Sequence, residues 1–238
     1  MPDVTELKRA LGTEAVDRFV RDGMSIGLGT GSTALWAVRR VGARLREGTL
    51  RNIRVVATSI QTDLEARAMD IPVVTLNDAA LRDGLDLTID GADEVDPRRN
   101  LIKGGGGALL LEKITAYASR RFLVIVDDSK LSSRLCERSP IPLEIVPQAV
   151  TPVLAAVKAL GAEASLRMGV RKAGPVVTDL GNLLLDVTFG TVFDPAVQED
   201  ALNRIPGVLD NGLFCRKRPE LLIAHAAGGL EYRGPEGS

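Results

Sequence analysis

The chain has 238 residues, with one histidine, His225, and two cysteines, Cys136 and Cys215. This scarcity excludes a structural zinc site, which needs about four Cys or His ligands, and a disulfide scaffold. Thirty basic residues against 31 acidic ones give a formal net charge of −1, so no overall basic field attracts nucleic acid. Only 3% of the residues are aromatic, which favours an aliphatic core of the kind found in helix-covered parallel sheets.

Membrane and secretory segments are not expected. No apolar stretch approaches the ~18 residues of a membrane span, and the first residues lack a basic region followed by an apolar one. We therefore expect a cytoplasmic protein with neither a membrane nor a nucleic-acid partner. The length predicts one large or two small domains, at roughly 150 residues per domain.

Helical and strand patterns alternate along the first 130 residues. Some segments repeat apolar residues with the helical period, and others are short runs rich in Val, Leu and Ile. The expected helices are 5–22, 34–45, 61–69 and 108–118. The expected strands are 25–28, 53–59, 73–76, 85–90 and 122–126. This alternation predicts an α/β fold with a doubly wound, mostly parallel, Rossmann-like sheet.

The pattern changes after residue 135, where four prolines between Pro140 and Pro152 indicate a domain boundary. The following elements are expected in the order strand, helix, strand, strand, helix, strand, as in a ferredoxin-like split βαβ unit. They are placed at 143–146, 149–160, 164–168, 183–187, 196–205 and 208–214, with 175–178 as a candidate extra strand.

Two domains follow from this reading. Residues 1–135 plus 213–238 are predicted to form a Rossmann-like catalytic domain, and 136–212 a smaller ferredoxin-like α+β domain. Strand 221–226 is expected to return to the first sheet, and the polar residues 231–238 to form a loose tail.

Residues 27–33, Gly-Leu-Gly-Thr-Gly-Ser-Thr, join an expected strand to an expected helix. Glycines allow a tight turn that presents backbone N–H groups, the helix start adds partial positive charge, and the hydroxyls add donors. This suits a phosphate monoester, although the segment is neither GxxxxGK[ST] nor GxGxxG. An ordinary glycine-rich turn fits equally well, so the motif alone leaves phosphate binding open.

An apolar strand runs directly into four acidic residues, Asp90, Asp93, Glu94 and Asp96. Sites in open α/β sheets lie at the carboxyl ends of strands. Acid–base catalysis, hydroxyl binding and a divalent metal all fit these carboxylates, and so does an acidic turn that caps a helix. Asp90 directly ends the strand and is the strongest candidate, whereas Glu94 and Asp96 are expected to be solvated.

Four consecutive glycines, 104–107, follow Lys103. Such a run is entropically costly, so a backbone that approaches a ligand explains it better than a linker. Lys103 supplies a positive donor for an anion or a developing oxyanion. Glu112 shares a helical face with Leu109 and Thr115; partial burial there would raise its pKa and suit a general base, although a surface charge also fits the spacing.

Three further features carry weaker signals. Residues 127–130, Asp-Asp-Ser-Lys, follow an apolar strand as a capped turn does, and Lys130 could help to hold an anionic substrate. His225 lies in an apolar run and is expected to be a buried structural residue. Cys136 and Cys215 belong to no paired motif and are expected to be inert thiols.

Together these segments resemble ribose 5-phosphate isomerases of the A type over nearly the whole chain. The matching pieces are GLGTGSTA at 27–34, TSIQT at 58–62, DLTIDGADEVD at 86–96, LIKGGGGALLLEKI at 101–114, VDDSK at 126–130, PLEIVPQA at 142–149 and IPGVLDNGLF at 205–214. The resemblance implies interconversion of D-ribose 5-phosphate and D-ribulose 5-phosphate through an enediolate, in the non-oxidative pentose phosphate pathway. It also implies a homodimer or homotetramer that uses no metal and no cofactor.

The resemblance assigns roles to individual residues, all of which are present. Glu112 matches the proton acceptor, Lys103 would stabilise charge, and Asp90 and Asp93 would assist ring opening and contact hydroxyls. The implied substrate-binding residues are Thr30, Gly31, Ser32, Thr33, Asp90, Gly91, Ala92, Asp93, Lys103, Gly104, Gly105, Gly106 and Lys130.

Three other functions share parts of the pattern. A sugar-phosphate-sensing module of a transcription regulator would keep the phosphate loop, but Lys103, Glu112 and the lack of a preceding DNA-binding region argue against it. An amino-sugar phosphate deaminase would want a histidine near the ring-opening step, where His225 is poorly placed. A coenzyme A transferase fits the two glycine-rich segments less well than a small phosphate does.

Overall fold

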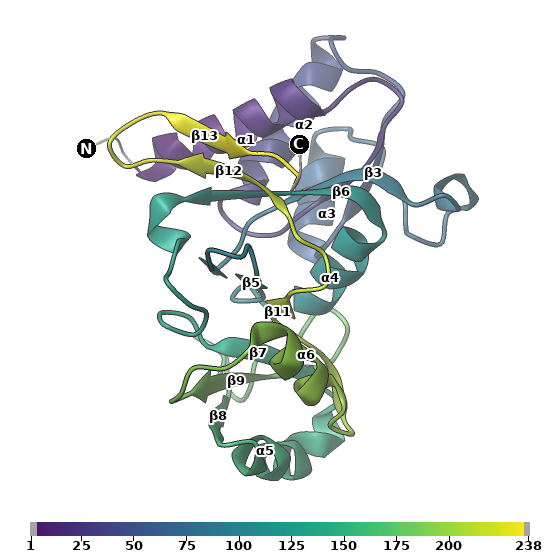
Figure 1. Ribbon diagram of the computed structural model, residues 1–238. Coiled ribbons are helices and arrows are strands. Elements are labelled where there is room, and N and C mark those ends of the chain that lie inside the picture. The colour runs from purple at the N-terminus through teal and green to yellow at the C-terminus, as the bar shows by residue number, and fades with distance from the viewer. Residues whose placement is uncertain (1–3, 236–238) are drawn as a thin grey trace. The chain divides into compact units, whose positions relative to one another are not determined.

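The computed structural model describes residues 4–235 (Figure 1). The chain divides into two compact units. The first consists of Met1–Ala92, Leu111–Lys130 and Lys217–Ser238, and the second of Asp93–Leu110 and Leu131–Arg216. Residues 93–110 therefore lie with the second unit, although the predicted catalytic domain, 1–135 plus 213–238, includes them. That the chain folds as two domains stays a prediction.

A six-stranded sheet forms the centre of the first unit, in the order β13-β12-β6-β3-β1-β2. Its strands are β1 Ser25–Leu28, β2 Arg54–Ala57, β3 Leu85–Asp90, β6 Ser119–Asp127, β12 Glu220–Ala224 and β13 Leu230–Arg233. All neighbours are parallel except β12 and β13, which confirms the predicted mostly parallel sheet. The chain runs from β1 to β2 on one side and later enters β3 on the other, so the carboxyl ends of β1 and β3 form the topological switch point.

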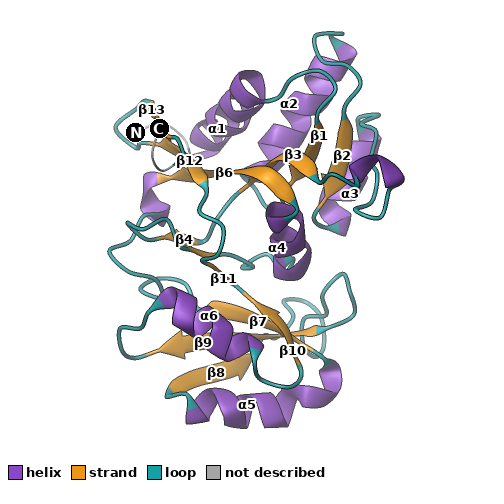
Figure 2. Cartoon of the chain, turned by 45° about the vertical axis from the view of Figure 1, so that its right-hand side comes forward, coloured by secondary structure: helices purple, strands orange, loops and turns teal. Residues whose placement is uncertain are grey.

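Helices cover both faces of this sheet. They are α1 Val4–Phe19, α2 Ala34–Arg46, α3 Ile60–Ala68 and α4 Leu109–Tyr117. Val16 of α1 and Val38 of α2 share a buried cluster with Ile26 of β1. The next residue of β1 faces the opposite way, because a Cβ at Gly27 would lie 2.5 Å from Cγ2 of Thr115 on α4. In Figure 2, α1 and α2 accordingly lie on one side of the sheet and α4 on the other.

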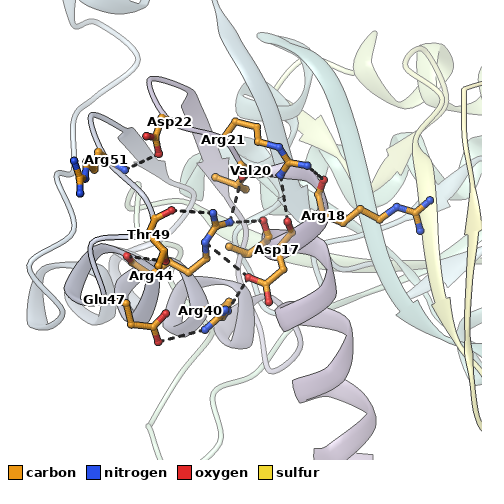
Figure 3. A network of polar contacts seen from close by, with 11 residues as sticks. Asp17, Arg18, Val20, Arg21, Asp22, Arg40, Arg44, Glu47, Thr49 and Arg51 are labelled. Carbon is orange, nitrogen blue, oxygen red and sulfur yellow. Dashed lines mark hydrogen bonds and ion pairs between the residues drawn. The ribbon is translucent and has the colours of Figure 1, made fainter.

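Figure 3 shows the polar contacts that join α1 to α2. Asp17 of α1 accepts a hydrogen bond from Nε of Arg40 at 2.8 Å. Nη1 of Arg44 donates to the carbonyl oxygens of Val16 and Val20 at 3.1 and 3.2 Å. The carbonyl of Val16 also accepts from the amide of Val20, just past the end of α1, so Arg44 adds donors at this helix end and its charge offsets the helix dipole. These contacts hold together the helix pair that covers one face of the sheet.

The second unit is built on a four-stranded antiparallel sheet in the order β10-β7-β9-β8. Its elements are β7 Ile141–Ile145, α5 Val150–Ala159, β8 Ala162–Leu166, β9 Leu183–Phe189, α6 Pro195–Asn203 and β10 Val208–Asn211, which confirms the predicted ferredoxin-like order. Ile141 and Leu143 share one buried cluster with Val153 of α5 and Leu202 of α6, so both helices cover the same face. The alternate residues of β7, such as Pro142, face the other side.

A small sheet in the order β11-β5-β4 also lies in the second unit, and the sequence analysis did not predict it. Its strands are β4 Glu94–Val95, β5 Leu101–Ile102 and β11 Leu213–Phe214. The prediction of one strand over 208–214 is wrong, because β10 and β11 pair in different sheets. Gly212 lies at the break: its amide donates to the carbonyl of Pro142 at 2.7 Å, and its carbonyl accepts from the amide of Lys103 at 2.9 Å.

The predicted strand 73–76 is also wrong. Val73 forms only an isolated bridge with Val55, and the chain then turns, with the amide of Asp78 donating to the carbonyl of Thr75. Residues 175–178 likewise form only isolated bridges. Three short 3₁₀ helices complete the elements: η1 Ala79–Leu81, η2 Asp128–Lys130 and η3 Pro147–Ala149.

The expectation of a loose C-terminal tail fails for residues 231–233, which pair in β13. The ring of Tyr232 lies 5.0 Å from that of Phe19. Its hydroxyl donates to Glu220, and burial together with this hydrogen bond raises the pKa of Tyr232. An aromatic anchor against α1 thus fixes the last strand, while residues 236–238 of the predicted tail lie outside the described residues.

Glu94 and Asp96, expected to be solvated, are both buried. The carboxylate of Glu94 is fully buried and accepts three backbone N–H hydrogen bonds, from Cys136, Glu137 and Ser139, at 3.1, 3.1 and 3.3 Å. Asp96 accepts from the amide and the side chain of Asn100 at 2.8 and 2.7 Å. Except for the side chain of Asn100, these donors are main-chain amides, which leave no mark in the sequence.

Neither cysteine forms a disulfide, and both are half-buried. Burial raises the pKa of the Cys136 thiol, which keeps it protonated at neutral pH and supports the expectation of an inert thiol. Among residues 4–235, no helix combines the length and the apolar character needed to cross a lipid bilayer.

The buried carboxylate of Glu94 makes a stability prediction. Glu94→Ala leaves three amide N–H groups without their acceptor and should lower the free energy of unfolding by about 2–5 kcal/mol. Urea denaturation measures the change, with Glu163→Ala, an exposed glutamate of β8, as the control. Equal midpoints for both variants would contradict the role of Glu94.

Candidate functional site

The carboxyl ends of the parallel strands gather most of the predicted site residues of the first unit. The loop with Thr30–Thr33 follows β1, Asp90 ends β3, and η2, which carries Lys130, follows β6. In a doubly wound sheet, ligands bind outside this edge at the switch point. The structure thus brings these three motifs to one edge of the sheet in this unit.

Asp90 and the loop after β1 are in direct contact. Asp90 is completely buried, and its Oδ1 accepts hydrogen bonds from the amides of Thr30 and Gly91 at 3.2 and 2.7 Å. A Cβ at Gly29 would lie 1.9 Å from this oxygen. Glycine is therefore required at position 29, because only a residue without a side chain lets the carboxylate lie against the loop.

A hydroxyl network supports the same loop from the second strand–helix turn. Oγ1 of Thr30 lies 2.8 Å from Oγ1 of Thr58, and Oγ1 of Thr62 donates to the carbonyl of Gly29 at 2.9 Å. Ser59 caps α3 by accepting from the amide of Thr62. Residues 58–62 match the family resemblance but have no predicted role, although the serine and threonine spacing at a helix start is a capping signal.

The loop opens onto the N-terminus of α2. Within the described residues, the amides of Ser32, Thr33 and Ala34 donate to no protein acceptor, and Thr33 makes no side-chain cap. Nζ of Lys8 on α1 donates to Oγ of Ser32 at 2.9 Å. Amides at a helix start, hydroxyls and a lysine form an anion-binding set. Sequence reasoning missed Lys8, because nothing distinguishes it from the other charged residues of α1.

Glu112 lies in the first turn of α4 and only 3% of its surface is exposed. The neighbouring Lys113 is equally buried. One turn later, the carbonyl of Thr115 accepts hydrogen bonds from the hydroxyls of Thr88 and Ser119, which fixes α4 against β3 and β6. The expected burial of Glu112 is confirmed, and a carboxylate on a fixed helix is a suitable proton acceptor.

The second unit contains Asp93, Lys103 and the glycines 104–106. Oδ2 of Asp93 accepts from the amide of Gly105 at 2.7 Å, so the acidic and glycine-rich motifs meet. Lys103 is 2% exposed, and its Nζ lies 5.6 Å from the ring centre of Phe214. A buried ammonium group beside oriented peptide groups can stabilise negative charge that develops on a ligand.

Two predicted residues lie at the edge of the first sheet. Lys130 is half-buried in η2, where the carboxylate of Asp128 accepts from the amide of Ala226 at 3.0 Å. His225 is half-exposed rather than buried, so its predicted core position is wrong; its Nε2 lies 3.0 Å from a carboxylate oxygen of Glu231. Hydrogen bonds from Arg233 and then from His225 lower the pKa of Glu231.

The predicted residues thus form two sets. The first unit contains Thr30–Thr33, Asp90–Ala92, Glu112 and Lys130. The second unit contains Asp93 and Lys103–Gly106. Carboxylates, lysines, hydroxyls and oriented amides are the available groups. Among residues 4–235, no group of three or more His, Cys, Asp or Glu side chains is arranged to hold a metal ion.

Comparisons with known proteins agree on one family. The family model for ribose 5-phosphate isomerase A (phosphoriboisomerase A) matches residues 54–228. A protein of Thermosynechococcus vestitus named ribose-5-phosphate isomerase A is 50% identical over 226 residues, which cover 95% of this chain and 94% of that protein.

Solved structures give the same result. A D-ribose-5-phosphate isomerase in complex with phospho-erythronic acid is 41% identical with a TM-score of 0.91, over 97% of this chain and 99% of that one. The ribose 5-phosphate isomerase from Plasmodium falciparum is 32% identical with a TM-score of 0.92, over 98% and 100% of the two chains.

The contact between Gly29 and Asp90 makes a second prediction. Gly29→Ala forces the Asp90 carboxylate or the loop to move and should lower the free energy of unfolding by about 1–3 kcal/mol. Urea denaturation and a crystal structure of the variant measure both effects. Gly190→Ala is the control, because a Cβ there meets no atom within 4 Å. A Gly29→Ala protein with unchanged stability and an unmoved carboxylate would refute the close approach.

Proposed function

We propose that this chain, which belongs to the ribose 5-phosphate isomerase A family, interconverts D-ribose 5-phosphate and D-ribulose 5-phosphate. The observation that carries the proposal is the match over nearly the whole chain. The chain also contains every site residue that the resemblance implies. A relative with 41% identity has been solved with phospho-erythronic acid, a phosphorylated sugar acid. A planar carboxylate on a sugar phosphate presents oxygens much as an enediolate does, which supports the same reaction for this chain.

The proton transfer is assigned to Glu112. In the aldose-to-ketose direction, its carboxylate takes the proton from C2, and the electron pair moves to form an enediolate with negative charge on the C1 oxygen. The same proton then returns to C1, while the C2 hydroxyl proton passes to the C1 oxygen. One buried carboxylate on a fixed helix serves both steps, which supports this role.

The negative charge and the sugar hydroxyls are assigned to other residues. Lys103 faces the developing oxyanion, since a buried ammonium stabilises such charge strongly when water is excluded. Asp90 and Asp93 assist furanose ring opening and contact hydroxyls. Both are fixed by backbone amides, which supports a precise placement of their remaining oxygens.

The phosphate is assigned to the loop Thr30–Thr33. The amides at the start of α2, the hydroxyls of the loop and Nζ of Lys8 support this assignment, and Lys130 adds a second cation at the same sheet edge. Gly91, Ala92 and Gly104–Gly106 are assigned as backbone contacts of the substrate. The reaction so described moves one proton between carbon atoms and needs no cofactor or metal.

The proposal extends to location and assembly. Reduced thiols at Cys136 and Cys215, outside any disulfide, support a reducing, cytoplasmic compartment. Exposed apolar side chains on α3 and α4, Ile60, Leu64 and Ile114, support burial against a second copy in a homodimer or homotetramer. The two compact units support the two-domain organisation.

An isomerase assay tests the proposed activity. The purified chain should convert ribose 5-phosphate to the ketose, detected by carbonyl colorimetry or circular dichroism. Turnover should be unchanged after dialysis against EDTA, because every assigned group is a side chain or a backbone amide. Binding of ribose 5-phosphate without turnover would instead support a sensing module, and loss of activity with EDTA would contradict the metal-free mechanism.

Replacing the proposed base makes the next prediction. Glu112→Gln keeps the size of the side chain but cannot accept the C2 proton, so kcat should fall about 10²–10⁴-fold with little change in KM. Glu199→Gln, at a glutamate of similar burial on α6, should keep the wild-type kcat. A folded Glu112→Gln enzyme with near-wild-type turnover would remove Glu112 from the mechanism.

A further inference from the structure

The glycine-rich segment of the second unit packs on the face of the four-stranded sheet that the helices leave open. A Cβ at Gly104 would lie 3.3 Å from Cγ of Pro142, and one at Gly107 3.3 Å from Cδ1 of Leu184. Both glycines have positive φ, +97° and +82°. The backbone here can follow this path only without side chains, and a run of four glycines has little stiffness of its own.

Hydrogen bonds from Arg167 restrain this flexible segment. It directly follows β8, and its Nη1 donates to the carbonyl oxygens of both Gly104 and Gly105 at 3.1 Å. On the other side of the guanidinium, Asp186 of β9 accepts from Nε at 2.9 Å and from Nη2. Only 17% of the Arg167 side chain is exposed. Four of its five N–H donors are thus used in one rigid fork, which lysine cannot reproduce.

This contact determines where the amides of the loop point. The C=O and N–H of a trans peptide point in opposite directions, so two carbonyls held by Arg167 direct the amides of Gly105 and Gly106 away from it. The amide of Gly105 reaches Oδ2 of Asp93 at 2.7 Å. Gly106 is an exposed residue, and its amide donates to no acceptor among the described residues.

We propose that Arg167, oriented by Asp186, is a positioning residue for the isomerisation, which holds these two peptide groups so that the Gly106 amide donates to a substrate oxygen. The inference rests on the proposed function, in which Lys103–Gly106 contact the sugar. The cation also polarises both peptide groups, which strengthens their amides as donors. Arg167 itself touches no substrate and acts only through the loop.

Substitution of Arg167 separates this role from a merely structural one. Arg167→Met removes all four donors, and Arg167→Lys keeps the charge but loses the fork. Both should lower kcat, Arg167→Met by about 10²-fold and Arg167→Lys by less, because a misplacement of about 1 Å has such an effect. KM should change little, since the phosphate loop Thr30–Thr33 lies elsewhere in the chain.

Arg121→Met is the matched control. Arg121 makes an equally bidentate pair with Glu220, at 2.8 and 2.7 Å, but contacts no glycine loop. Its loss should lower the melting temperature as Arg167→Met does, with kcat per folded molecule unchanged. If both Arg167 variants keep the wild-type kcat per folded molecule, the proposal is overturned.

Amide hydrogen exchange gives a readout that is independent of turnover. Exchange at Gly105 should become at least tenfold faster in Arg167→Met and remain as in the wild type in Arg121→Met, because only the first variant frees the loop. Unchanged exchange at Gly105 would overturn the positioning role even if kcat falls. An inactive wild-type chain would refute the proposed function, whereas faster exchange in Arg167→Met would still establish that Arg167 orders the loop.

Discussion

The acidic segment 90–96 organises the loops around it through one kind of interaction, a carboxylate that accepts backbone N–H groups. Asp90 accepts from the amides of Thr30 and Gly91, and Asp93 from that of Gly105. Glu94 accepts from three amides between residues 136 and 139. Such charge-assisted bonds are about twice as strong as neutral ones, so three acidic residues within five positions fix loops that lie far apart in the sequence.

These partners are backbone groups, which every residue type carries. The sequence therefore identifies the acidic residues as candidates but predicts only part of the contacts that their carboxylates make. Asp90 was identified by its place at the end of an apolar strand, and the glycines 104–107 by their entropic cost. Glu94 was expected to be solvated, since its acceptor role depends on amides more than 40 residues away that any residue type could supply. Local pattern placed most helices and strands, whereas the break at Gly212 depends on pairing with Pro142, which no local pattern encodes.

The same preference for backbone groups explains how the proposed chemistry proceeds with one histidine. In the proposed reaction, the phosphate is assigned to the amides and hydroxyls of Thr30–Thr33 and the start of α2, and the sugar to the amides of the glycine-rich loop. Side chains are then needed only for proton transfer and for the negative charge, roles that the proposal assigns to the buried Glu112 and Lys103. His225 lies half-exposed beside Glu231 and takes no part in this division.

A site made of peptide groups in a glycine-rich loop has an entropic disadvantage, because such a backbone loses much conformational entropy when it becomes ordered. Fixing one residue costs about 1–2 kcal/mol, and more for glycine, so a ligand that had to order four glycines would lose much of its binding energy. In this chain the loop loses that entropy during folding, before any ligand binds. Asp93 accepts from the N–H of the Gly104–Gly105 peptide, and Arg167 donates to the carbonyl of the same peptide. The rigidity of the loop therefore depends on a residue more than 60 positions away, whose importance is visible only once the loop has folded.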